Sequence, residues 1–123
     1  KNVIFTGKKN PEEISDLMNT SKLLLMASSF EGLPRVLIES GLCGLPSLAS
    51  DIQGISTPFG EYGGTLLYKY NDAEDFIINI DKFYKDPELQ LKLSDKSSEL
   101  CNSLSGENKF KKNWERIEEM LYE

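Results

Sequence analysis

The sequence predicts an α/β fold in which helices flank a parallel β-sheet. Two observations lead to this prediction. Between residues 3 and 68, short apolar runs alternate with helical patterns, which is the arrangement of right-handed βαβ units. The length of 123 residues and the hydrophobic content of 39% suit one domain with a modest core.

The first apolar run, VIFTG at residues 3–7, predicts a buried strand because it is short, rich in β-branched and aromatic residues, and closed by a glycine. A helix is expected next, since Asn10 can act as N-cap, Pro11 suits the first helical position, and two glutamates follow in the first turn. KLLLMAS at residues 22–28 predicts a second buried strand.

The next helix, PRVLIESGLCG, is expected to begin at Pro34 and end near Gly44. LPSLAS at residues 45–50 predicts a third strand, and GTLLY at residues 64–68 predicts a fourth. The expected sheet therefore contains at least four parallel strands.

Helical patterns fill the rest of the chain. The first of these helices is expected to begin behind an Asn71 or Asp72 cap. Its expected apolar face consists of Phe76, Ile77, Ile80, Phe83 and Tyr84. The next helix repeats the pattern with Leu89, Leu93, Leu100 and Leu104, and the last with Phe110, Trp114, Ile117 and Leu121. Helical spacing favours packing over ligand binding for these last side chains.

The predicted organisation is a single partial domain, residues 1–123, with βα units at 1–68 and C-terminal helices at 71–123. The chain begins inside a predicted strand and lacks an initiating Met, so it is expected to be part of a longer protein.

Composition excludes several classes of function. The 14 basic and 20 acidic residues give a net charge of -6, which argues against a nucleic-acid partner. No apolar run is long enough for a transmembrane segment, so the protein is expected in the cytoplasm, with membrane association left to a missing domain. Without histidine, Ser-His and Cys-His nucleophiles are excluded. Cys43 and Cys101 are expected to be buried free thiols, and neither a metal nor another cofactor is expected.

Glu31 and Glu39 form the candidate site. Their separation of eight residues also occurs in Glu99/Glu107 and is uninformative, but Glu31 follows a predicted strand and Glu39 lies inside the next helix. Ligands of parallel sheets bind at that edge.

The turn at Gly32 and the helix N-terminus suit an anion there. Glu39 lies roughly 7 Å further along the helix, within reach of a ribose. The alternative, equally compatible with the spacing, is a surface turn glutamate at 31 and a solvated Arg35–Glu39 ion pair.

The segment SSFEGLPRVLIESGLCGLPSLASDIQGI, residues 28–55, strongly resembles the donor site of family 4 glycosyltransferases, which are retaining enzymes of the GT-B fold. The resemblance implies a Rossmann-like partial C-terminal domain that binds a nucleotide-sugar donor, in an enzyme of polysaccharide biosynthesis. It implies that Glu31 bonds the transferred sugar as the catalytic residue and Glu39 bonds the ribose. The other implied donor-binding residues are Gly32, Leu33 and Pro34, with Lys8, Lys9 and Asn10 matching the nucleobase loop by position.

Two departures accompany this resemblance. The family follows its Asp-x-x-Gly turn with an apolar-Pro-Glu-apolar stretch, whereas this chain reads DIQGISTPFGEYGG, and Glu61 does not replace the missing acid. The family's diphosphate-binding Arg/Lys pair and its N-terminal acceptor domain lie upstream, so this chain alone is expected to be inactive. Two alternatives stay open: a non-hydrolysing nucleotide-sugar epimerase or phosphorylase, and a non-catalytic nucleotide-sugar-binding module.

Overall fold

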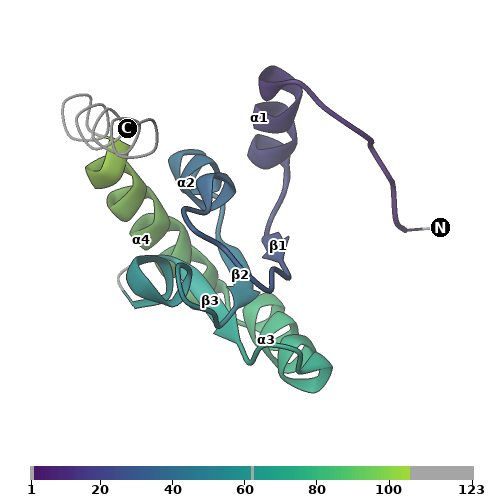
Figure 1. Ribbon diagram of the computed structural model, residues 1–123, viewed down its shortest axis with the longest axis vertical. Helices are drawn as coiled ribbons and strands as arrows, with labels where there is room; N and C mark the ends of the chain where they lie inside the picture. The colour runs from purple at the N-terminus through teal and green to yellow at the C-terminus, as the bar shows by residue number, and fades with distance from the viewer. Residues whose placement is uncertain (1, 62, 106–123) are drawn as a thin grey trace, which may run out of the picture.

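The computed structural model describes residues 2–61 and 63–105 of the chain (Figure 1). It confirms an α/β fold with a parallel sheet and flanking helices. The elements in chain order are α1 (Pro11–Thr20), β1 (Leu24–Met26), α2 (Arg35–Leu42), β2 (Ser47–Ser50), the irregular helical segment η1 (Ser56–Gly60), β3 (Thr65–Tyr68), α3 (Ala73–Lys85) and α4 (Pro87–Ser105).

The sheet has three strands in the order β1-β2-β3, and both neighbouring pairs are parallel. The central strand β2 is buried along its whole length, as expected for a parallel strand covered on both faces. In contrast, β1 lies at the edge, and Leu25 is 50% exposed. The prediction of a fully buried strand at residues 22–28 is therefore wrong in part.

The predicted strand at residues 3–7 is not formed. Val3, Ile4 and Phe5 are 73%, 84% and 95% exposed, and Figure 1 shows this segment leading away from the other elements. A strand needs the backbone hydrogen bonds of a neighbouring strand, and no described strand pairs with these residues. Apolar composition alone therefore gave a wrong prediction here, and the described sheet has three strands rather than four.

Local sequence signals set the helix ends as expected. Asn10 caps α1: its side-chain oxygen accepts from the N–H of Glu13 at 2.9 Å, and the Glu13 carboxylate accepts from the N–H of Asn10 at 3.4 Å. At α3 the cap is Asp72, whose carboxylate accepts from the N–H of Asp75 at 2.9 Å. Pro34 directly precedes α2, and Gly44 follows it with a φ of 69°.

The core lies between α2, β2, η1 and α4, and its buried residues are Leu37, Ile38, Ala49, Ile55, Phe59 and Cys101. α2 and α4 pack side by side (Figure 1) because Gly41 has no side chain: a Cβ there would overlap the Cys101 Sγ atom. Burial raises the pKa of the Cys101 thiol to about 11. Both cysteines are free as predicted, with Cys101 buried and Cys43 half-buried. This packing fixes α2, which enters the site described below.

The apolar face predicted for α3 is correct in part. Phe83 is buried, and Phe76 and Ile80 are half-buried, whereas Ile77 and Tyr84 are 63% and 56% exposed. The two exposed residues are seven positions apart, which places them on one stripe turned away from the sheet.

In α4, Leu93 is buried and Leu89, Leu100 and Leu104 are half-buried, as predicted. The predicted last helix, with Phe110, Trp114, Ile117 and Leu121, lies outside the described residues, so its packing role stays a prediction. In the described part of the chain, no helix has the length and apolar character needed to cross a membrane.

Candidate functional site

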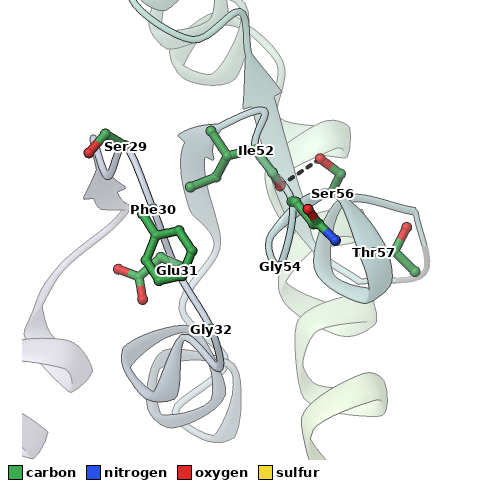
Figure 2. Close-up of a pocket in the computed structure, with 9 residues that line it drawn as sticks. Ser29, Phe30, Glu31, Gly32, Ile52, Gly54, Ser56 and Thr57 are labelled. Atoms are coloured by element: carbon green, nitrogen blue, oxygen red, sulfur yellow. Dashed lines mark hydrogen bonds between the residues drawn. The ribbon is translucent and has the colours of Figure 1, made fainter.

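Two loops meet at the carboxyl-terminal edge of the sheet. One follows β1 and leads into α2, and the other follows β2 and leads into η1. They border a cavity of about 1030 Å³ (Figure 2). Its lining residues are Ser29, Phe30, Glu31 and Gly32 from the first loop, and Ile52, Gln53, Gly54, Ser56 and Thr57 from the second loop and η1. A cavity therefore lies at the edge of the sheet where the sequence predicts ligand binding.

Glu31 is held in a defined place in the first loop. It is half-buried, and its Oε1 atom accepts a hydrogen bond from the Ser28 hydroxyl at 2.8 Å. The Ser28 carbonyl in turn accepts from the Ser50 hydroxyl at 2.5 Å, which ties the loop to the end of β2. Within the described residues, Oε2 of Glu31 accepts no hydrogen bond. One carboxylate oxygen is therefore fixed, and the other has no donor among the described residues.

Next to Glu31, backbone donors stand at the start of α2. Among the described residues, the N–H groups of Gly32 and Leu33 have no hydrogen-bond acceptor. Gly32 is exposed, and no heavy atom lies within 4 Å of the place where a Cβ would stand. Pro34 is buried and carries no N–H of its own. Free N–H groups and a positive helix end suit an anion or an oxygen-rich ligand.

Glu39 lies further along α2 and borders a different cavity. It is exposed, and it lines a groove of about 400 Å³ between α1 and α2. The remaining residues of this groove are Pro11, Ile14, Ser15, Met18, Leu42 and Cys43. The structure therefore places both predicted glutamates on or beside α2 but does not bring them into one cavity.

The predicted nucleobase loop has structural contacts of its own. The side-chain oxygen of Asn10 is occupied by the α1 cap, and Lys9 Nζ lies 3.2 Å from Glu13 Oε2. Lys8 is exposed. A contact of these residues with a nucleobase stays a prediction.

Sequence reasoning missed most of the second wall of the Glu31 cavity. Gln53, Ser56 and Thr57 line it, and only the Asp-x-x-Gly turn that ends at Gly54 could have indicated them. Glu61 is not among the lining residues; it accepts a hydrogen bond from the Thr57 hydroxyl at 3.0 Å. The expectation that no metal takes part stays a prediction.

Comparisons with known proteins agree with this fold. The sequence model of the family described as Glycosyl transferases group 1 matches residues 1–100. A protein of Haemophilus influenzae named "Uncharacterized glycosyltransferase" is 30% identical over 106 residues, which cover 85% of this chain and 30% of that protein. Sucrose-phosphate synthase from Thermosynechococcus elongatus has the same fold, with a TM-score of 0.81 and 21% identity, over 97% of this chain and 30% of the synthase. The chain thus spans about 30% of the length of both proteins.

Proposed function

The chain belongs to the glycosyl transferases group 1, and from this premise we propose that it is the donor-binding part of a retaining, family 4 enzyme. This enzyme transfers a sugar from a nucleotide sugar to an acceptor. One observation carries the proposal: Glu31 and Gly32 line a large cavity at the ligand edge of the sheet, and the N–H groups of Gly32 and of its neighbour Leu33 have no acceptor among the described residues.

The chemistry of this cavity matches the sugar and diphosphate of a donor. Oε2 of Glu31 is available to accept from sugar hydroxyls, while the Ser28 hydrogen bond holds the carboxylate in place. The N–H groups of Gly32 and Leu33 suit diphosphate or sugar oxygens. Ligand pockets commonly measure about 300 to 1,000 Å³, and this cavity, at about 1030 Å³, has room for a ligand as large as a sugar diphosphate.

The groove between α1 and α2 supports a second set of contacts. Its carboxylate, Glu39, is exposed and can accept from both hydroxyls of a ribose. Pro11 and Ile14 of α1 form the opposite side, next to the loop with Lys8, Lys9 and Asn10. We therefore place the donor along α2, with its sugar at Glu31 and its nucleoside toward Glu39 and α1.

Catalysis in this proposal rests on stabilising the leaving diphosphate. Preorganised N–H groups lower the free energy of the charge that develops as the bond to the sugar breaks. The acceptor hydroxyl then attacks the sugar from the face that the nucleoside diphosphate leaves and gives its proton to that leaving group, so configuration is retained. Diphosphate-binding cations and acceptor contacts come from other parts of the enzyme, since the chain spans about 30% of its relatives.

The test is a donor screen on the intact enzyme. Nucleotide sugars are offered with candidate acceptors, products are detected by mass spectrometry, and the anomeric configuration is read by NMR. We expect a glycosylated product with the configuration of the donor. An inverted product would contradict retention, and an epimerised donor formed without acceptor would favour an epimerase. If the intact enzyme bound no nucleotide sugar, the proposal would be wrong.

A further inference from the structure

Gly54 lies where the two walls of the Glu31 cavity touch (Figure 2). It belongs to the tight turn after β2, in which the N–H of Ile55 donates to the carbonyl of Ile52 at 3.1 Å. Its φ is +94°, a backbone conformation that residues with a side chain rarely adopt. The turn therefore strongly favours glycine at this position.

The contact of Gly54 with the first loop is unusually close. A Cβ built on Gly54 would overlap the carbonyl oxygen of Glu31 and would lie 3.2 Å from the carbonyl oxygen of Gly32. On the Gly32 side the space is open, with no atom within 4 Å of its own Cβ position. Because Gly54 has no side chain, the backbone of the second loop can approach the backbone of the first loop at Glu31. The open space beside Gly32 does not lie between the two loops.

We propose that Gly54 is a positioning residue for the donor site: its bare backbone sets the place of the Glu31–Gly32 peptide. It acts together with the Ser50–Ser28 hydrogen bond, which holds the same loop three residues earlier. The two contacts fix the loop on both sides of the Glu31 side chain. The effect on donor chemistry rests on the proposed function, whereas the effect on the loop does not.

The size of the effect follows from the overlap. Relieving it requires a movement on the order of 1 Å, and misplacement by that distance can cost about a hundredfold in rate at a reacting centre. The carboxylate of Glu31 and the N–H groups of Gly32 and Leu33 would move with the peptide. Glu39 lines the other groove and has no contact of this kind with Gly54.

Two variants of Gly54 and one control variant separate the steric overlap with the Glu31 carbonyl from the backbone strain of a positive φ. Gly54→Ala introduces both, while Gly54→Asn keeps the overlap with less strain, because Asn tolerates positive φ better than Ala. Gly44→Ala is the matched control: its φ is +69°, but its Cβ would lie 3.4 Å from the nearest atom, Ser94 Oγ, and it does not line the cavity.

The first measurement needs no ligand. Hydrogen–deuterium exchange of the intact protein reports the amides of Arg35 and Leu37, which donate to the carbonyls of Leu33 and Pro34 at 2.9 and 3.0 Å. We expect severalfold faster exchange in both Gly54 variants and wild-type exchange in Gly44→Ala. Unchanged exchange in the Gly54 variants, or wild-type behaviour of Gly54→Asn alone, would overturn the proposal.

The second measurement is a double-mutant cycle in the intact enzyme. We expect Gly54→Ala to lower kcat/KM about ten- to a hundredfold in wild type and by a smaller factor in a Glu31→Gln background, where only the displaced N–H groups of Gly32 and Leu33 still cost rate. Equal fold-losses in both backgrounds would show that Gly54 does not act through Glu31. If the wild-type enzyme turns over no donor, the proposed function fails, and the exchange experiment still decides the role of Gly54.

Discussion

At the scale of single residues, Glu31 and Glu39 differ in their surroundings. Glu31 is half-buried, bonded by Ser28 and placed at the large cavity, whereas Glu39 is exposed on α2 and lines the groove toward α1. A carboxylate with a fixed position suits a contact that must hold in the transition state. An exposed carboxylate at the neighbouring groove suits ground-state binding. The two substitutions should therefore affect different ligands.

We predict that Glu39→Ala in the intact enzyme weakens binding of the nucleoside diphosphate and the nucleotide sugar alike, because both contain the ribose. Glu31→Ala should spare the nucleoside diphosphate and lower turnover with the sugar donor. Each lost charged hydrogen bond should cost about 1.5 to 3 kcal/mol, or roughly ten- to a hundredfold. Calorimetry with the nucleoside diphosphate and steady-state kinetics with the sugar donor measure these effects.

The control for this pair is Glu99→Ala, since Glu99 is exposed on α4 and lines neither cavity. Small, equal losses in all three variants would show that the eight-residue interval is a coincidence. A loss of nucleoside diphosphate affinity in Glu31→Ala alone would reverse the two assignments.

At the scale of elements, the start of α1 offers a test of the predicted nucleobase loop. Asn10 forms both hydrogen bonds of the capping box with Glu13. We predict that Asn10→Ala lowers the free energy of unfolding by about 1 kcal/mol. Nucleoside diphosphate affinity should change less than about threefold, because the side-chain oxygen is already occupied by the cap. Urea unfolding and calorimetry of the intact protein report the two quantities.

Lys8→Ala is the companion variant, because Lys8 is exposed and has no described partner. It should leave stability unchanged. A tenfold loss of nucleotide affinity in both variants, at unchanged stability, would instead assign the loop to the nucleobase.

The elements also show what sequence reasoning can reach. Helix starts were predicted correctly because a cap such as Asn10 bonds a residue three positions away. The prediction of a strand at residues 3–7 is wrong, because a strand needs a neighbouring strand to pair with, and no local sequence pattern reveals that neighbour. In the candidate site, the place of Glu31 after a strand predicts that it lies at the ligand edge of the sheet, and Glu31 does line the cavity there. Its support from Ser50 and Gly54 was missed, because these contacts join residues more than 20 positions apart.

At the scale of the whole molecule, two properties bear on donor binding by this chain alone: its negative net charge, and the small share of its relatives' length that it spans. The net charge is -6, and Glu31 and Glu39 add negative charge beside the two cavities. A diphosphate therefore meets backbone N–H groups but a repulsive overall field. The relatives are more than three times longer than the part that matches here. Under the proposed function, cations and acceptor contacts therefore come from elsewhere in the enzyme.

We predict that the isolated 123-residue chain transfers no sugar and binds a nucleotide sugar only weakly. A surface that supplies one wall cannot bury most of the ligand, as formed pockets do. No lysine or arginine is among the described residues that line the two cavities, so nothing there offsets the diphosphate charge. Circular dichroism first establishes that the isolated chain is folded. Calorimetry and a product assay then compare it with the intact enzyme. A dissociation constant in the micromolar range would show that donor binding needs nothing beyond these residues. Product above background would show the same for catalysis.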